Sequence, residues 1–311
     1  MHPTLTYELK IAFTEAPVSA IVTKQKFIDW LLVNGVESFV EGELACDINQ
    51  NQDEPPRDHY TELGGDLTPV VVYRYSRETL DDLKVKLARD FPRGVEATIG
   101  SMATETWMEG WKSSFKPFAA GRFFVRPPWE KAPCPAGLAE LVIEPGMAFG
   151  TGQHATTRLC LEALSSPVIA LLARGGAGRV LDVGTGTGIL ALGAIRLGFG
   201  KALGTDIEDD ALLAARENAR LNALELPVRM GSIPAGEQHE LVLANILAMV
   251  LVRLMPELAA ALAPGGRLVL SGLLETEEDE VVTAAERAGL ALSATHRLDG
   301  WSALVVAHAA P

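Results

Sequence analysis

The segment from Asp182 to Gly188 contains the residues best suited to binding a cofactor. It reads Asp-Val-Gly-Thr-Gly-Thr-Gly and follows the apolar residues Val180 and Leu181. An apolar stretch with helical spacing begins at Ile189. Glycines permit backbone angles that other residues resist, and they let a ligand approach the main chain closely. The pattern predicts a strand, a tight turn and a helix start. The candidate cofactor-binding residues here are Asp182, Gly184, Gly186 and Gly188.

The spacing of these glycines separates several cofactor classes. The dinucleotide-binding fingerprint is G-x-G-x-x-G, whereas here the third glycine comes one residue early and Ile189 takes its place. A phosphate-binding loop needs a Lys followed by Ser or Thr, and this segment has neither. The spacing D-x-G-x-G-x-G instead resembles the first motif of the S-adenosylmethionine-dependent methyltransferases with a doubly wound sheet.

A second acid, Asp206, ends the next predicted strand. It follows Asp182 at close to the roughly 20-residue offset of a ribose-binding acid in a βαβ unit. A carboxylate there can accept hydrogen bonds from both ribose hydroxyls. Asp206 could also cap the helix predicted from Asp209, since Asp is a common N-cap residue, and the two roles are compatible. Asp206 and its neighbour Ile207 are therefore candidate cofactor-binding residues.

A second glycine-rich segment runs from Glu144 to Leu161, with glycines at 146, 150 and 152. So many glycines indicate a tight bend or contact with a ligand. Thr156 or Thr157 could cap the apolar helix that follows, or a Thr hydroxyl could bind the methionine part of a cofactor. His154 could accept a proton or could shape the loop through hydrogen bonds, because a lone His does not identify a base.

Asn245 follows a buried apolar strand that begins at Leu241. In open α/β sheets, ligands bind beyond the carboxyl ends of the strands. The side-chain carbonyl of Asn245 could orient an amine by accepting its hydrogen bond, which makes this residue a candidate for both catalysis and cofactor binding. Alternatively, Asn245 caps the next helix.

Composition and charge limit the other possibilities. The chain has 311 residues, 48% hydrophobic and 22% charged, which is enough for two globular domains. A net charge of −13 argues against a broad nucleic-acid-binding face, so we predict no direct nucleic-acid binding. The same charge is compatible with a basic protein substrate.

The cysteines Cys46, Cys134 and Cys160 are scattered without a C-x-x-C pair. This spacing predicts neither a metal site nor a disulfide framework, and it suits a reducing compartment. The N-terminus lacks the apolar core of a signal peptide. The longest apolar region, 241–263, is interrupted by polar residues and proline, so it predicts no membrane span. We therefore expect a cytoplasmic protein.

The first hundred residues predict a small domain of the ferredoxin-like type. The expected order is β-α-β-β-α-β. The elements are 4–13, 18–33, 38–46, 70–75, 78–91 and 95–99, with a loop at 47–69. Residues 101–130 predict a linker, with a helix over 104–115 whose face carries Trp107 and Trp111 and with prolines near its end.

Residues 131–311 predict the cofactor-binding domain. The expected strands are 139–143, 179–183, 202–206, 227–230, 240–244, 267–271, 290–297 and 301–307. The expected helices are 155–164, 188–197, 209–222, 249–262 and 275–288. Such alternation predicts a mostly parallel sheet covered on both faces. The short turn at Asp299-Gly300 predicts that the last two strands form an antiparallel hairpin. The expected fold is an α/β, doubly wound, seven-stranded methyltransferase sheet.

Together these motifs resemble the bacterial ribosomal protein L11 methyltransferase family. The resemblance is carried by Pro145 to His154 with Thr156-Thr157, by Asp182 to Gly188, by Asp206 and by Ala244 to Leu247. The segment with Trp107, Trp111, Lys112, Phe115 and Pro117 and the run Pro128-Trp129-Glu130 also resemble the linker of that family. The resemblance implies S-adenosylmethionine as cofactor. The residues implied to bind it include Thr157, Gly184, Asp206 and Asn245, and the motif adds Phe149, Gly150 and Thr151 as candidates.

The resemblance further implies methyl transfer to lysine side chains and to the N-terminal amine of ribosomal protein L11, with the N-terminal domain recognising that partner. The first hundred residues carry no distinctive motif, so another protein or a small molecule is an alternative substrate. A glutamine-modifying relative would carry Asn-Pro-Pro-Tyr where this chain has Asn245-Ile246-Leu247-Ala248. A non-catalytic cofactor-binding subunit is a further alternative, as is a nicotinamide oxidoreductase, which the early third glycine disfavours.

Overall fold

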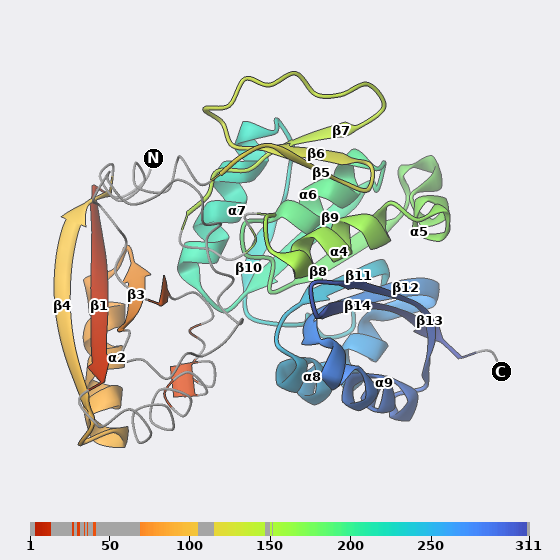
Figure 1. The fold of residues 1–311 in the computed structure, drawn as a ribbon. Helices are drawn as coiled ribbons and strands as arrows, with labels where there is room; N and C mark the ends of the chain where they lie inside the picture. The colour runs from red at the N-terminus through yellow and green to blue at the C-terminus, as the bar shows by residue number, and fades with distance from the viewer. Residues whose placement is uncertain are drawn as a thin grey trace. The chain divides into compact units, whose positions relative to one another are not determined.

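The computed structural model describes two units of the chain. The described residues are 4–13, 27, 30–31, 34, 36, 40–41, 69–104, 115–146, 150 and 152–309. The first unit is Met1–Ser114 and the second is Phe115–Pro311 (Figure 1). The division therefore falls inside the segment 101–130 that was predicted as a linker. Most of the predicted tryptophan helix lies outside the described residues.

The first unit contains a four-stranded antiparallel sheet in the order β2-β3-β1-β4. Its elements are β1 (Leu5–Phe13), β2 (Val40–Glu41), β3 (Val70–Arg74), α2 (Arg77–Asp90) and β4 (Val95–Ala103). Helix α2 begins after Ser76, whose hydroxyl accepts a hydrogen bond from the amide of Thr79, and its leucines pack on the sheet. Most of the predicted helix 18–33 and loop 47–69 lies outside the described residues, so the ferredoxin-like topology stays a prediction.

The second unit is built on the predicted seven-stranded, mostly parallel sheet, in the order β10-β9-β8-β11-β12-β14-β13. The strands are β8 (Arg179–Val183), β9 (Lys201–Asp206), β10 (Val228–Met230), β11 (His239–Asn245), β12 (Leu262–Leu274), β13 (Leu290–Leu298) and β14 (Trp301–His308). Strands β8 to β12 pair in parallel, and β14 pairs antiparallel with both β12 and β13. The predicted C-terminal hairpin is confirmed.

Helices cover both faces of this sheet, because successive residues of its buried strands point to opposite sides. Val180 belongs to one hydrophobic cluster and Leu181 to another. The helices are α4 (Ala155–Leu164), α5 (Pro167–Leu172), α6 (Ile189–Arg196), α7 (Asp209–Leu221), α8 (Ala248–Ala261) and α9 (Glu278–Arg287), with short 3₁₀ turns at Arg174–Gly176 and Glu275–Glu277. Helices α4 and α6 lie on one side of the sheet, and α8 and α9 on the other (Figure 1).

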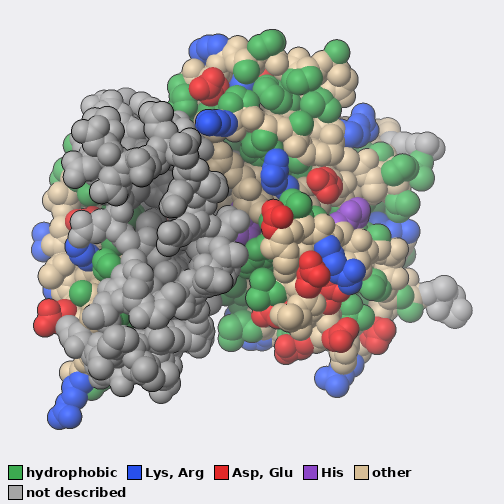
Figure 2. Space-filling model, in the orientation of Figure 1, with side chains coloured by type: hydrophobic (Ala, Val, Ile, Leu, Met, Phe, Trp, Pro, Cys, Tyr) green, Lys and Arg blue, Asp and Glu red, His purple; other side chains and the backbone are tan. Residues whose placement is uncertain are grey.

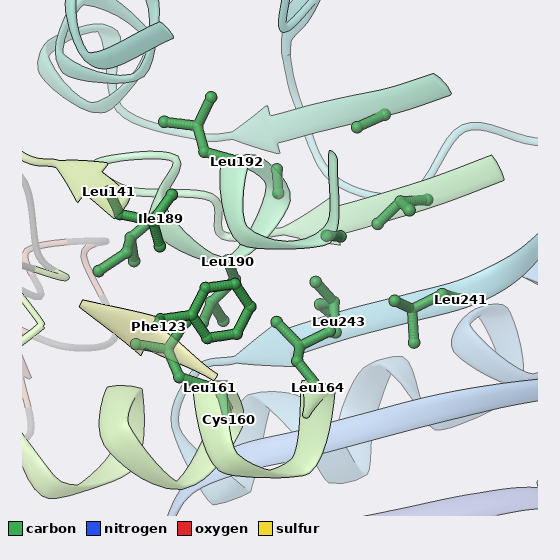
Figure 3. Close-up of a cluster of buried hydrophobic side chains, with 14 of the residues drawn as sticks. Phe123, Leu141, Cys160, Leu161, Leu164, Ile189, Leu190, Leu192, Leu241 and Leu243 are labelled. Atoms are coloured by element: carbon green, nitrogen blue, oxygen red, sulfur yellow. The ribbon is translucent and has the colours of Figure 1, made fainter. Parts of the chain in front are cut away.

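A second, three-stranded sheet belongs to the same unit. It consists of β5 (Phe118–Ala120), β6 (Phe123–Arg126) and β7 (Ala139–Val142), with β6 and β7 parallel. Phe123 of β6 is fully buried among Leu161, Ile189 and Leu190 (Figure 3). This pairing and burial tie residues 118–126 to the second unit, although they were predicted in the linker.

Two further observations concern the charged side chains and the helices of the chain. On the face drawn in Figure 2, basic and acidic side chains of the described residues are interspersed. Within the described part of the chain, no helix has both the length and the apolar character needed to cross a bilayer.

Candidate functional site

The predicted glycine turn lies between β8 and α6. Gly184, Gly186 and Gly188 have φ angles of +69°, +53° and +80°, a region that residues with a Cβ adopt only at a cost. A Cβ added to Gly184 would collide with the side chain of Ile246. The amides of Gly184 and Thr185 both donate to the carbonyl of Thr205, at 2.9 Å. The turn is therefore held against the end of β9.

Asp182 shapes this turn from the inside. Its carboxyl group is buried, and Oδ2 accepts hydrogen bonds from the Thr185 hydroxyl at 2.8 Å and from the Ala191 amide at 3.2 Å. Burial raises the pKa of Asp182 to about 7, against the opposing effect of these two donors. A buried carboxyl group disfavours its charged form unless donors compensate. The contacts thus connect Asp182 to the turn and to the first turn of α6.

Asp206 occupies the end of β9. Its Oδ2 accepts a hydrogen bond from the Gly186 amide at 2.9 Å, and its Oδ1 accepts one from the Glu208 amide at 3.0 Å. Burial raises the pKa of this carboxyl group, while the neighbouring backbone amides oppose the rise. A carboxylate has about four lone-pair directions, so it can accept further donors such as two ribose hydroxyls.

The surroundings of Asp206 also test the alternative prediction that it caps the following helix. The N-cap of α7 is Glu208, so Asp206 is not the helix cap. Ile207 is 57% exposed, and Met230, which pairs with Asp206 across β9 and β10, is 48% exposed. Both are apolar residues beside the carboxylate.

Two glycines of the second glycine-rich segment have left-handed backbone angles. Gly150 and Gly152 have φ angles of +97° and +93°. A Cβ on Gly152 would lie 2.7 Å from the ring of Phe118 and 3.0 Å from Ile189. The hydroxyl of Thr187, in the glycine turn, donates to the carbonyl of Gly150, so the two glycine-rich segments meet. The candidates Phe149 and Thr151 lie outside the described residues.

His154 is the N-cap residue of α4, in place of Thr156 or Thr157. Its Nδ1 accepts a hydrogen bond from the Thr156 amide at 3.3 Å and lies 2.8 Å from the Thr156 hydroxyl. Its ring packs edge-on against Trp301, with 4.8 Å between the ring centroids. Sequence reasoning missed Trp301, which only the folding of the C-terminal hairpin brings to this helix.

The structure places two of the predicted cofactor-binding residues, Asn245 and Thr157, next to each other. Asn245 lies at the end of β11, and its Nδ2 faces the buried hydroxyl of Thr157 at 3.5 Å. Its Oδ1 is buried and has no hydrogen-bond partner among the described residues. Because an unpaired buried acceptor is costly, this oxygen indicates a place for a donor from a ligand. The N-cap of α8 is Leu247, so Asn245 does not cap that helix.

Gly272 packs closely against the backbone that follows Asn245, and the sequence analysis did not identify it. It has a φ angle of +84°, and a Cβ there would collide with the backbone of Ile246. The pairing of β12 with β14 is irregular at the same place, between Ser271 and Leu273. A glycine inside a strand pattern often marks such a bulge or a close backbone approach, which was the available signal.

The ends of three neighbouring strands thus present complementary groups. Strands β9, β8 and β11 are adjacent in the sheet, and ligands bind at this edge of open α/β sheets. The groups are a carboxylate, a turn of left-handed glycines and an unpartnered amide oxygen, which fit a cofactor with ribose hydroxyls and further hydrogen-bond donors. The mostly parallel sheet with its antiparallel last hairpin and this site define an α/β methyltransferase, a class whose cofactor is S-adenosylmethionine.

The chain belongs to the ribosomal protein L11 methyltransferase (PrmA) family, whose model matches residues 24–309. The L11 methyltransferase of Geobacter sulfurreducens is 46% identical over 212 residues, which cover 67% of this chain and 68% of that protein. The corresponding protein of Syntrophotalea carbinolica is 46% identical over 214 residues, covering 68% and 69%. The crystal structure of an L11 methylase from Lactobacillus delbrueckii subsp. bulgaricus superposes with a TM-score of 0.56 at 29% identity, covering 62% of this chain and 99% of that one.

Proposed function

We propose that this protein transfers methyl groups from S-adenosylmethionine to lysine side-chain and N-terminal amines of ribosomal protein L11. Family membership supports the substrate, and the unpartnered Oδ1 of Asn245 is the structural observation that carries the amine chemistry. S-adenosylmethionine, when bound, supplies a methyl group made electrophilic by its positively charged sulfur. The residues of the site bind the cofactor and orient the substrate amine.

Residues at the strand ends would hold the cofactor. Asp206 would accept hydrogen bonds from the ribose hydroxyls, next to the exposed side chain of Ile207. The glycine turn would leave room for the cofactor against the main chain. Thr157 and the backbone near Gly150 would bind the methionine part. Asp182 would act indirectly, through its hydrogen bonds to the turn.

The substrate amine must be neutral before it can attack. A free lysine has a pKa near 10.4 and an α-amine a pKa near 7.7–8.0, so lysine is the harder substrate. Removal of water from the site lowers the pKa of an ammonium group. The Oδ1 of Asn245 would accept a hydrogen bond from the amine and so direct the nitrogen lone pair. Water would take the proton that the amine loses. Positioning and desolvation then provide most of the rate enhancement.

The first unit would present the protein substrate. Its antiparallel sheet is compatible with the predicted ferredoxin-like domain. Among the described residues, the hydrophobic clusters of the second unit consist of residues from Ala120 onward, so we expect a variant of residues 115–311 to fold. We expect this variant to bind the cofactor but to lose L11 methylation, and retained L11 methylation would contradict the role of the first unit.

The direct test is incubation of the full chain with isotope-labelled S-adenosylmethionine and unmodified L11, followed by intact-mass analysis and peptide mapping. We expect mass gains in whole methyl steps, located on amines. Asp206→Asn should weaken cofactor binding by about tenfold or more, because hydrogen bonds to charged groups contribute roughly 1.5–3 kcal/mol. Asp209→Asn, at an exposed position in the first turn of α7, is the matched control and should behave like the wild type.

Each outcome separates one part of the proposal. If L11 gains no mass although the cofactor binds, the substrate is wrong. If methyl groups are found only on other side chains, the amine specificity is wrong. Equal cofactor binding by Asp206→Asn and the wild type would refute the cofactor site.

A further inference from the structure

We infer that Asn218, in the last turn of α7, is a positioning residue that holds the two glycine-rich segments together and so keeps the cofactor site in its binding arrangement. The inference deepens the proposed function and rests on S-adenosylmethionine being the cofactor. Nothing in the sequence analysis had singled out this residue.

Both polar atoms of the Asn218 side chain are engaged outside its own helix. The side chain is buried, with 1% exposure. Its Oδ1 accepts a hydrogen bond from the Glu144 amide at 2.8 Å, and its Nδ2 donates to the Thr187 carbonyl at 2.9 Å. Glu144 begins the second glycine-rich segment, and Thr187 lies in the glycine turn. One amide group therefore bridges two backbone positions that come from distant parts of the chain.

A second contact joins the same two segments. The hydroxyl of Thr187 donates to the carbonyl of Gly150. Thr187 thus binds the second segment twice, through its carbonyl by way of Asn218 and through its own side chain. Because Thr187 stands between Gly186 and Gly188, a change in either contact acts directly on the turn beside Asp206.

The neighbouring asparagine shows what a purely structural role looks like. Asn222 lies one helical turn after Asn218 and is also buried, at 4% exposure. Its Oδ1 accepts from the Val142 amide at 2.9 Å, and its Nδ2 donates to the Val142 carbonyl at 2.7 Å and to the Asn218 carbonyl at 2.8 Å. Strand β7 ends its sheet, so Asn222 satisfies an open strand edge as another strand would.

The physical difference lies in which atoms lose a partner. Without the donor of Asn218, the buried Thr187 carbonyl is unsatisfied, which is costly. The protein can relieve that cost by moving the glycine turn or the segment at Glu144, and both movements disturb the cofactor site. Without the donor of Asn222, the relieving movement is at Val142, in the edge strand.

Matched substitutions separate these roles. Asn218→Asp and Asn222→Asp each keep a side-chain acceptor and remove the donor. Binding of S-adenosylhomocysteine by calorimetry and thermal unfolding without ligand are measured for both. Both variants should unfold at a lower temperature than the wild type. We expect Asn218→Asp to weaken binding by about tenfold and to raise the KM for the methyl donor with little change in kcat, whereas Asn222→Asp should bind within about twofold of the wild type.

Thr187→Val provides a test that does not alter the helix. It removes the hydroxyl contact to Gly150 and should also weaken binding, and its effect should be non-additive with that of Asn218→Asp because both contacts hold one arrangement. Should Asn218→Asp fail to fold, Asn218→Ser and Thr187→Val carry the same comparison. Equal binding by the Asn218 and Asn222 variants, or wild-type binding by Thr187→Val, would overturn the role of Asn218. If the wild type does not bind S-adenosylhomocysteine, the proposed cofactor is refuted as well.

Discussion

The two glycine-rich segments of the site both contain glycines with positive φ angles, but the contacts that hold these glycines differ. In the first, the turn after β8 is held mainly by its own residues and the next strand. Asp182 binds Thr185 and the start of α6, and the turn amides bind Thr205. Much of this conformation is local to the segment.

In the second segment, the contacts at Glu144, Gly150 and Gly152 come from elsewhere in the chain. Glu144 is bound by Asn218, Gly150 by Thr187, and Gly152 packs closely against Phe118. These partners belong to α7, to the glycine turn and to β5. The first segment can therefore be understood from its sequence, whereas the second depends on the assembled fold.

The largest effect is expected from a substitution in the first segment. Gly184→Ala adds a Cβ at a φ angle of +69° that collides with Ile246. Backbone strain and overpacking together should lower the free energy of unfolding by roughly 2–5 kcal/mol, with loss of S-adenosylhomocysteine binding. Urea unfolding and calorimetry measure both quantities.

Two alanine controls separate the causes of that effect. Gly289→Ala has a φ angle of +79° but open space around the new Cβ, so it reports backbone strain alone. Gly146→Ala, in the second segment, has open space and no positive φ angle, so it should be close to neutral. A Gly184→Ala variant as stable as Gly289→Ala would contradict the close packing at Ile246.

An intermediate effect concerns the buried acid of the first segment. The pKa of Asp182 is about 7 in the folded protein, against an ordinary value of 3.8. The folded state therefore binds more protons than the unfolded state between these values, so this group lowers the free energy of unfolding as pH rises from about 4 to about 7. Asp182→Asn cannot ionise. Over that pH window its stability relative to the wild type should rise, by roughly 2–4 kcal/mol.

Urea unfolding at several pH values measures this change. Parallel curves for Asp182→Asn and the wild type would mean that Asp182 stays charged across the window.

The smallest expected effect concerns His154, at the start of α4. Asn is among the best N-cap residues, whereas Ala costs about 1 kcal/mol at such a position. His154→Asn should therefore keep the helix cap and most of the methylation rate, and His154→Ala should lose about 1 kcal/mol of stability. A fall in kcat of about 10²-fold or more in His154→Asn, with stability unchanged, would instead indicate a general base.

Much of the second unit follows from periodicity. Helix α4 has the predicted bounds 155–164, and the bounds of β8 are also as predicted. Strand β12 is longer than predicted and continues through Gly265-Gly266, which were expected to lie outside it. Strand β5 and helix α5 were missed because three and six residues are too few to show a period.

The sequence by itself determined the family, the alternation of strands and helices, and the positions of the glycine turn, Asp206 and Asn245. These features depend on backbone geometry and on residues close together in the chain, so their spacing reveals them. Tertiary structure alone decided that Thr187 binds Gly150, that Asn245 faces Thr157, and that Asn218 joins the two glycine-rich segments. Those roles are hydrogen bonds whose partners are chosen by the packing of the elements, and local spacing contains no record of that choice.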